Sequence, residues 1–231
     1  KSSNSYSYLS IPYFKVISEN KDMTLTPRLY NDDKFLIQSE YRQENLNSSH
    51  ISDVSYSNGV NQNSKSHFFY KFNKKLDFLN FDVSELFIKV EQTSNDTYLK
   101  KDKLNSPIIL DTNTLENSFV FDMSSKDLSI NSEIKIYEDL SNKDNNDRYE
   151  FVFPKIDLVK KIDNKTDLEG DFYLKSNNSI KNYETNIYEK ININDLLFNS
   201  NSKINDSGFY NSYDFIIKNV NSDTQNSTNY K

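Results

Sequence analysis

The sequence predicts an all-β fold: an antiparallel up-and-down sheet of the transmembrane β-barrel class, of which this chain forms an incomplete fragment of about ten to twelve strands. Three observations support this fold class. Apolar and polar residues alternate with a period of two over segments of about 8 to 12 residues, close to the roughly 9–11 residues of tilted membrane strands. Hydrophobic residues make up only 35% of the chain, whereas aromatic residues reach 14%. A barrel needs apolar residues only at alternate positions, together with aromatic girdles.

The predicted elements follow in order along the chain. Residues 23–30 and, after a turn at 31–33, residues 35–42 alternate apolar with polar side chains most clearly. Later segments with the same period are 68–72, 86–90, 115–123, 128–136, 151–153, 168–174, 187–193 and 209–217. Phe69 interrupts the polar side of its segment, residues 49–57 alternate poorly, and residues 94–113 are expected to form the longest irregular loop.

The composition bounds the class of protein further. The chain has 231 residues, a net charge of -6 and no cysteine, so it has no disulfide framework and no thiolate metal site. Because no basic patch stands out, nucleic acid is not expected as a partner. No stretch approaches the roughly 18 apolar residues of a membrane-spanning helix. The N-terminus lacks the apolar region of a signal peptide, so an exported protein would carry its signal upstream and this chain would be an internal fragment.

Residues for catalysis are not apparent in the sequence. His50 and His67 lie in separate predicted strands without cysteine or acidic partners at ligand spacing, so we expect polar solvent- or lumen-facing side chains and no metal. The 34 acidic residues are scattered. No Gly-x-Ser-x-Gly motif, Gly-rich phosphate loop or Cys-His pair occurs. The sequence therefore predicts no enzyme, no metal and no cofactor.

Two prolines interrupt good strand patterns. Pro12 follows Tyr8-Leu9-Ser10-Ile11, and Pro27 follows Thr24-Leu25-Thr26. Proline has no amide N–H, so in a sheet it is confined to edges, strand ends or bulges. If residues 8–17 pair with residues 22–31 across a turn near 18–21, the sheet begins with two adjacent strands weakened by proline. Each proline could instead mark only a strand end or a bulge.

The stretch around these prolines resembles a known family, the lipopolysaccharide-assembly outer-membrane protein LptD, also called OstA or organic solvent tolerance protein. Residues 11–28, which begin Ile-Pro-Tyr-Phe and end Thr-Leu-Thr-Pro-Arg, are similar to the family's Pro-Tyr-Tyr-Trp…Asn-x-Asp-x-Thr-x-Thr-Pro stretch. Later segments that resemble family motifs, in the same order, are Glu40-Tyr41-Arg42, residues 93–99 and residues 151–156. The turn at 31–34 departs from the basic, Gly-containing turn of the family.

The resemblance implies that residues 1–231 are the N-terminal portion of an LptD-like barrel of roughly 26 strands, with a periplasmic jelly-roll domain before it and further strands after it. It implies location in the cell outer membrane and three partners: lipopolysaccharide, an LptE-like lipoprotein plug, and a periplasmic LptA-like bridge reached through the jelly-roll domain. In the family, prolines of the first two strands help form a lateral gate, and Pro12 and Pro27 match them.

The leading hypothesis is therefore a non-enzymatic translocon barrel that inserts lipopolysaccharide into the outer leaflet through a lateral gate. The side chains expected to face its lumen are Thr24, Thr26, Arg28, Gln38, Glu40 and Arg42. Those expected to face lipid are Met23, Leu25, Leu29, Phe35, Ile37 and Tyr41. Two alternatives remain from the residues alone: another outer-membrane barrel, such as a porin or uptake channel, and a soluble extracellular β-sheet adhesin.

Overall fold

The computed structural model describes residues 7–60, 62–143, 147–183 and 186–226. These residues form long β-strands and one short helix, α1 (Tyr98–Lys101). The strands are β1 (Tyr8–Ser10), β2 (Tyr13–Ser18), β3 (Lys21–Tyr30), β4 (Lys34–Asn45), β5 (Ser48–Gly59), β6 (Gln62–Lys75), β7 (Val83–Thr93), β8 (Thr114–Ser124), β9 (Leu128–Asp139), β10 (Tyr149–Ile162), β11 (Gly170–Tyr183), β12 (Ile187–Ser200), β13 (Lys203–Ile204), β14 (Tyr210–Asn211) and β15 (Asp214–Gln225).

The strands form an antiparallel meander, which confirms the predicted all-β, up-and-down fold. One 13-stranded sheet follows the chain from β1 and β2 to β15, while β13 and β14 form a separate hairpin between β12 and β15. Both β1 and β2 pair with β3. Among the described residues, β15 pairs with β12 and not with β1 or β2, so the sheet is open, which is compatible with the predicted incomplete fragment of a barrel.

The chain divides into two compact units. Unit 1 comprises residues 1–75, 86–119 and 137–148, and unit 2 comprises residues 76–85, 120–136 and 149–231. In unit 1, cross-strand partners lie on the same side of the sheet, so the register sorts the side chains of β3 and β4 into two faces. On one face Thr24 lies opposite Glu40 and Thr26 opposite Gln38; on the other, Met23 lies opposite Tyr41.

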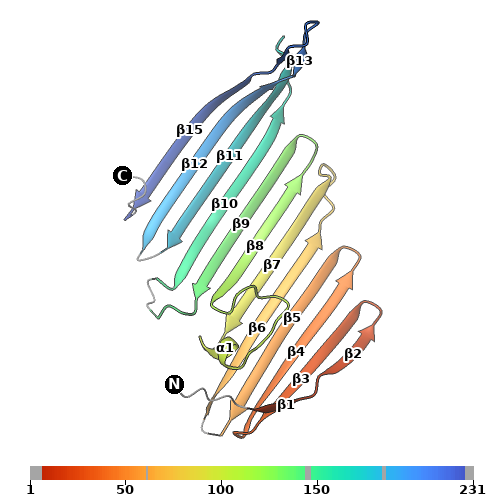
Figure 1. The fold of residues 1–231 in the computed structure, drawn as a ribbon, viewed down its shortest axis with the longest axis vertical. Helices are drawn as coiled ribbons and strands as arrows, with labels where there is room; N and C mark the ends of the chain where they lie inside the picture. The colour runs from red at the N-terminus through yellow and green to blue at the C-terminus, as the bar shows by residue number, and fades with distance from the viewer. Residues whose placement is uncertain (1–6, 61, 144–146, 184–185, 227–231) are drawn as a thin grey trace. The chain divides into compact units, whose positions relative to one another are not determined.

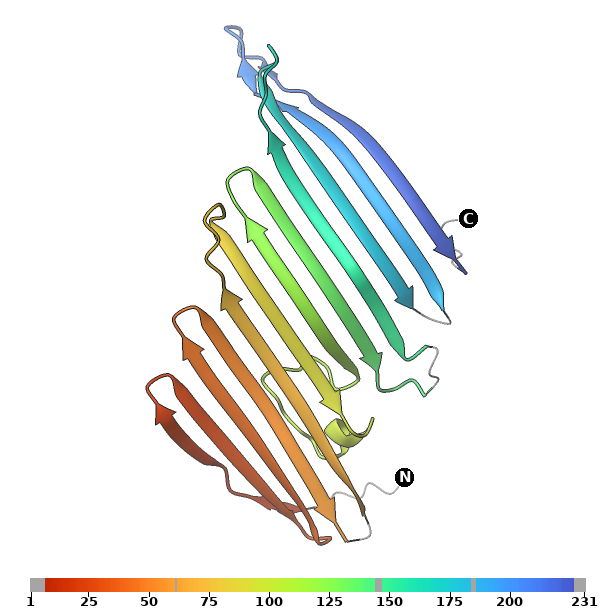
Figure 2. The same cartoon turned by 180° about the vertical axis from the view of Figure 1, so that it is seen from behind.

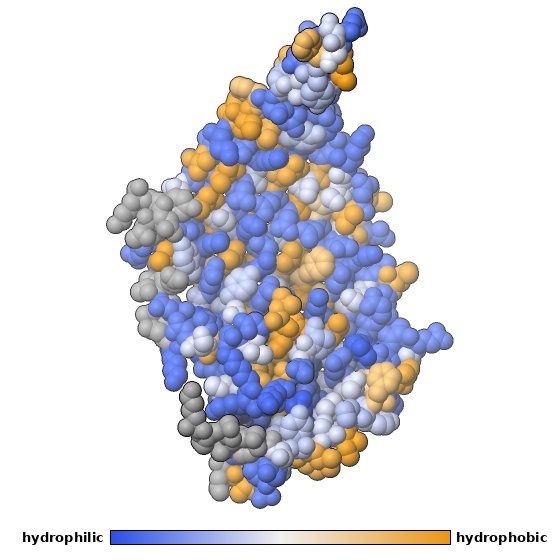
Figure 3. Space-filling model, in the orientation of Figure 1, coloured by the Kyte–Doolittle hydropathy of each residue, from blue (hydrophilic) through white to orange (hydrophobic). Residues whose placement is uncertain are grey.

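The first of these faces is covered by residues 94–113, which we call the strap (Figure 1). The strap connects β7 to β8 and contains α1. We call the covered side the strap face and the opposite side the bare face; the latter is turned to the viewer in Figure 2. Hydrophilic side chains predominate around the strap (Figure 3). Residues 94–113, predicted to be an irregular loop, are therefore packed against the sheet.

The strap forms the apolar core of unit 1. Its buried side chains Tyr98, Leu99, Leu104 and Ile108 pack in one cluster with Leu36, Phe69 and Leu115 of the sheet and with Leu140, which directly follows β9. This cluster explains why an aromatic ring interrupts the polar side of β6. The ring of Phe69 is fully buried beneath the strap, so it belongs to the core and not to a solvated face.

Strand β5 corrects the expectation for residues 49–57. Their weak alternation arises because the buried positions on the strap face are polar: Asp53, Ser55 and Ser57 are all nearly inaccessible. The bare-face partners Val54 and Tyr56 remain exposed. β5 is therefore a regular strand in which polar side chains are buried and apolar side chains are exposed.

In unit 2 the alternation does not produce an apolar face. Ile191 and Ile193, expected to belong to one, lie opposite Ser179 and Asn177 of β11 and share their side of β12 with Glu189 and Asp195. The same side of β10 carries Lys155, whose ammonium group is 3.2 Å from the carboxylate of Asp157. This face of unit 2 is therefore rich in charges.

The opposite face of unit 2 is uncharged at its centre but polar. Four side chains form a closed ring of hydrogen bonds: Asn178 donates to Ser176, Ser176 to Asn194, Asn194 to Asn192, and Asn192 to Asn178. Apolar residues of this face lie toward one end, where Phe172 and Phe198 pack with ring centroids 4.7 Å apart, and on β10, where Ile156 and Leu158 lie opposite Asn178 and Ser176. Strands β11 and β12 thus present polar side chains on both faces.

Candidate functional site

The N-terminal edge of the sheet contains both prolines at one level. Tyr8, Leu9 and Ser10 pair with β3 in the same register as residues 13–16, and Ile11 and Pro12 between them belong to neither strand. Because the register is unchanged across the gap, Ile11 lies opposite Pro27 and Pro12 lies opposite Thr26. The structure therefore brings the two prolines together at a single interruption of the first ladder. This is the arrangement expected if residues 8–17 pair with residues 22–31.

The direction of the backbone groups shows which hydrogen bonds are missing. The amide of Asn31 donates to the carbonyl of Ser7 at 3.2 Å, and the amide of Glu44 donates to the carbonyl of Asn20 at 2.9 Å. Successive residues of a strand direct their backbone groups alternately to its two neighbours. Odd-numbered residues of β3 therefore face β1 and β2, and even-numbered residues face β4.

This alternation gives the two prolines different effects. Pro27 is odd-numbered, so the donor that it lacks would have bonded the first strand at Ile11. Pro12 falls at a position whose amide would point away from β3, toward the open edge of the sheet. Pro27 thus removes a hydrogen bond between the first strand and β3. Pro12 removes a donor from the open edge of the sheet, where a further strand could pair.

The six residues expected to face a lumen share the strap face, but their surroundings differ. Thr24, Thr26 and Glu40 are half-buried and Arg42 is exposed. Arg28 and Gln38 are buried under the strap, where Arg28 donates to the carbonyl of Asp102 at 2.8 Å and Gln38 to that of Asn105 at 2.8 Å. The strap therefore covers Arg28 and Gln38, and the assignment of this face to a lumen stays a prediction.

The six residues expected to face lipid share the bare face. Leu29 lies opposite Phe35, and Met23 opposite Tyr41. Leu29, Phe35 and Ile37 are exposed, with 61%, 42% and 38% of their surface accessible. Leu25 continues across the sheet through Ser39 and Val54 to Phe68, which is also exposed. Unit 1 therefore carries an exposed, largely apolar surface on this side.

A buried polar network lies beneath the strap, and sequence reasoning missed it. The hydroxyl of Ser55 lies 2.5 Å from Nδ1 of His67 and 2.8 Å from the hydroxyl of Tyr98. Nε2 of His67 lies 3.3 Å from the carboxylate of Asp53, which also accepts hydrogen bonds from Gln38. The sequence signal was a period-two match: Asp53, Ser55 and His67 occupy facing positions of neighbouring strands.

This network contains serine, histidine and aspartate, yet its geometry is that of a structural cluster. Asp53, Ser55 and His67 each expose 2% of their surface or less. In a catalytic triad the nucleophile is open to the substrate and the acid orients the ring from Nδ1. Here the serine occupies Nδ1, and it shares its hydroxyl with buried Tyr98. The cluster therefore fixes the strap on the sheet, and burial raises the pKa of Tyr98.

Charged contacts hold the strap near its start and directly after α1. Arg148 contacts Asp96 at 2.7 Å and Glu138 at 2.6 Å. The guanidinium of Arg148 holds the pKa of Asp96 below its usual range, mainly through their hydrogen bond. Beyond α1, the carboxylate of Asp102 pairs with Lys34. Because these partners come from the sheet and its connections, they fix the strap to the sheet on either side of α1.

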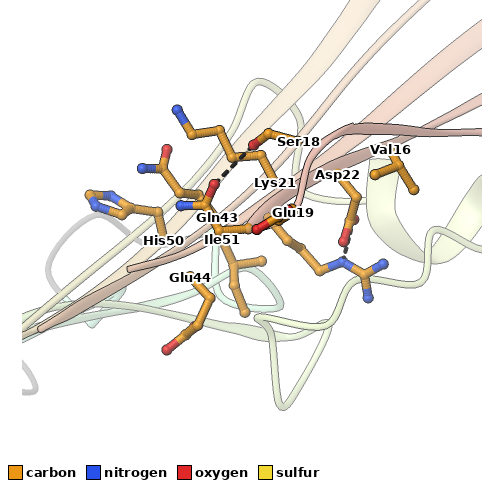
Figure 4. Close-up of a pocket in the computed structure, with 11 residues that line it drawn as sticks. Val16, Ser18, Glu19, Lys21, Asp22, Gln43, Glu44, His50 and Ile51 are labelled. Atoms are coloured by element: carbon orange, nitrogen blue, oxygen red, sulfur yellow. Dashed lines mark hydrogen bonds and ion pairs between the residues drawn. The ribbon is translucent and has the colours of Figure 1, made fainter. Parts of the chain in front are cut away.

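A cleft of about 450 Å³ lies at the hairpin end of β2–β5 (Figure 4). Arg42 pairs there with Asp22 at 2.8 Å, and the hydroxyl of Ser18 donates to the side-chain carbonyl of Asn20 at 2.9 Å. The other lining residues are Val16, Glu19, Lys21, Gln43, Glu44, His50 and Ile51. The cleft is therefore mainly polar, with two aliphatic side chains in its wall.

The helices, the metal-ligating side chains and the relatives of the chain all bear on the class of protein. Within the ranges that the structure covers, no helix combines the length and the apolar character needed to cross a membrane. In the same ranges, no group of three or more His, Asp or Glu side chains is arranged to hold a metal ion. In comparisons with known proteins, no family model and no curated protein matches the chain. The fold and its N-terminal edge define the class: an open antiparallel sheet whose first ladder is interrupted.

Proposed function

We propose that this chain is the gate-side part of an LptD-like outer-membrane barrel that inserts lipopolysaccharide into the outer leaflet. The observation that carries the proposal is the interruption at the N-terminal edge, where Ile11 and Pro12 leave the ladder opposite Thr26 and Pro27. In a membrane, an unpaired backbone group costs several kcal/mol, so a seam normally resists opening. A seam that already lacks donors opens at a lower cost.

The two prolines suit a lateral gate in complementary ways. Pro27 weakens the contact between the first strand and β3, and Pro12 weakens any contact between the first strand and a closing strand. Lipopolysaccharide acyl chains would leave sideways through this seam while the sugars pass along the lumen. The proposal includes an LptE-like plug within the barrel and delivery by a periplasmic LptA-like bridge.

The bare face supports a position in lipid. Its mainly apolar rows in β1–β4, interrupted by Lys15 and Ser39, extend from the level of Leu9 to the level of Met23, about 20 Å along the strands. This is comparable to the apolar band of about 25 Å on outer-membrane barrels. Beyond these rows the same face becomes polar, with Gln43 opposite His50. The change from apolar to polar side chains is the pattern expected at a membrane interface.

The test is the double substitution Pro12→Ala with Pro27→Ala in the full-length protein. Each restored hydrogen bond should contribute about 1 kcal/mol, so we expect the open seam to be at least ten times less populated. Lipopolysaccharide export should fall, and outer-membrane permeability to large antibiotics should rise. The control is Pro107→Ala, in an exposed part of the strap outside any ladder. Normal permeability and normal surface lipopolysaccharide in the double variant would contradict the proposal.

A second candidate, a soluble extracellular sheet protein such as an adhesin, is favoured by unit 2. The ring of Ser176, Asn178, Asn192 and Asn194 occupies the less charged face of β11 and β12, where a membrane strand would present apolar side chains. The two candidates differ in partition between water and detergent. A barrel partitions with detergent, and an adhesin stays in the aqueous phase.

A further inference from the structure

Strand β5 ends at the only Asn-Gly pair of the sequence, Asn58-Gly59. Asn58 is exposed and lies on the bare face, opposite Phe35. The ladder between β5 and β6 is irregular here, because its register shifts between Ser57 and Gly59. The side chain of Asn58 is therefore open to water at an irregular place in the sheet.

The backbone nitrogen of Gly59 lies against the side chain of Asn58. It donates a hydrogen bond to Oδ1 of Asn58 at 2.9 Å, which brings the side-chain carbonyl up to the next nitrogen of the chain. Glycine has no Cβ, so no side chain shields this nitrogen. Asparagine is among the residues that are chemically labile in proteins. The arrangement is suited to attack by the nitrogen of Gly59 on Cγ of Asn58, which closes a five-membered ring.

Close packing favours glycine at position 59. Gly59 lies opposite Lys34 of β4, and a methyl group added to it would meet Cβ of Lys34 at 3.1 Å and Cα at 3.2 Å. Lys34 in turn pairs with Asp102 of the strap, and both side chains are largely buried. The glycine that exposes Asn58 to attack is thus the residue that lets β4 and β5 approach each other beside this ion pair.

We propose that Asn58 is a site of spontaneous deamidation, and that its product loosens the strap. The nitrogen of Gly59 bonds to Cγ of Asn58 and the Cγ–Nδ2 bond breaks. The side-chain nitrogen leaves as ammonia, together with the amide proton of Gly59. Water then opens the cyclic imide at either of its carbonyl groups. Opening at the side-chain carbonyl gives aspartate, and opening at the backbone carbonyl gives isoaspartate.

Isoaspartate at position 58 would change the geometry of the strand end. Its main chain runs through the former side chain, which adds a methylene group directly before Gly59. Gly59 then no longer fits against Lys34, so the pair of Lys34 with Asp102 weakens and the strap loosens. This site is independent of the proposed function, because the reaction needs only water and every residue involved belongs to unit 1.

The experiment is incubation of the purified full-length protein in alkaline and in acidic buffer, followed by peptide mass mapping with fragmentation that identifies isoaspartate. Asn63 is the matched control, because it is exposed in the same hairpin and is followed by Ser64. We expect Asn58 to convert at least tenfold faster than Asn63. Conversion should be faster in alkaline buffer, where the attacking nitrogen loses its proton more readily. Equal rates at the two asparagines would overturn the proposal.

A second measurement tests the effect on the strap. The amide of Leu104 donates to the carbonyl of Leu99 at 3.0 Å, so its hydrogen exchange reports the strap. Incubated protein should exchange at this amide at least fivefold faster than fresh protein. Asn58→Gln should show no change on incubation, because its longer side chain closes the ring far more slowly. Unchanged exchange after conversion of Asn58 would overturn the proposal.

A third variant separates the new charge from the longer main chain. Freshly prepared Asn58→Asp carries the carboxylate without the added methylene, so its Leu104 amide should exchange like that of fresh unsubstituted protein. Exchange as fast as in the incubated protein would mean that charge alone loosens the strap, and would overturn the role given to the fit of Gly59 against Lys34.

Discussion

Leu99→Ala is expected to lower the free energy of unfolding of unit 1 by about 3 kcal/mol, since removing a buried leucine side chain from a packed core costs roughly 2–5 kcal/mol. Leu99 is 1% exposed and belongs to the only buried apolar cluster found within the described residues. In the described part of unit 1, no second apolar cluster compensates for the lost contacts of Leu99. The strap should therefore detach before the sheet unfolds.

The measurement is urea unfolding of the purified protein in detergent, followed by tyrosine fluorescence. Leu110→Ala is the matched control, because Leu110 lies in the same segment and is 93% exposed. It should change the unfolding midpoint very little. Equal midpoints for Leu99→Ala and the unsubstituted protein would show that the strap does not stabilise the sheet.

Asp53→Ala is expected to cost about 3 kcal/mol as well, for an electrostatic reason. Its fully buried carboxylate accepts hydrogen bonds from Gln38 and lies 3.3 Å from His67. Removing one member of a buried polar network leaves its partners desolvated and unpaired, which costs more than the hydrogen bonds themselves contribute. Replacing the carboxylate by a methyl group should therefore loosen β5, β6 and the strap together.

The effect can be separated from simple loss of charge. Asp77→Ala removes an exposed carboxylate outside the network, and its free energy of unfolding should stay within about 0.5 kcal/mol of that of the unsubstituted protein. In a double-mutant cycle, Asp53→Ala and Gln38→Ala should be less than additive by about 1–2 kcal/mol. Additive effects would mean that the two side chains stabilise the sheet independently.

The sequence predicted most about β3 and β4, where alternation is clean. The two groups of side chains read from residues 23–42 are the two faces of the sheet in unit 1. The position of Pro12 and Pro27 at one interruption of the first ladder was also foreseeable, because a turn near 18–21 makes residues 8–17 pair with residues 22–31. The alternation could not predict which face of the sheet would be covered, or that the strap would cover it.

The strap is the clearest example of information that is absent from local patterns. Its long-range contacts bury Arg28, Gln38 and Asp53, which polarity alone places in solvent. They also explain Phe69 and the weak alternation of β5. His67 and Asp53 are 14 residues apart and come together only through the β5–β6 register. Such clusters depend on which strands pair, and local patterns in a single sequence do not predict strand pairing.

In unit 2 the same period-two reasoning identified strands but misjudged their faces. Ile187, Ile191 and Ile193 do alternate, yet Glu189 interrupts them on their own strand and polar residues of β11 lie opposite. Burial of a face is a property of several strands at once, so one apolar strand does not make an apolar face.

The central claim is that the first ladder of the sheet is weak because Pro12 and Pro27 interrupt it. Site-resolved amide hydrogen exchange of the full-length protein in detergent tests this within one strand. Leu25 and Leu29 direct their amides toward the first strand, whereas Thr24 and Thr26 direct theirs toward β4. We predict that the amides of Leu25 and Leu29 exchange at least tenfold faster, and that Pro12→Ala with Pro27→Ala removes most of the difference. Equal protection of the two sets of amides in the unsubstituted protein would contradict the account.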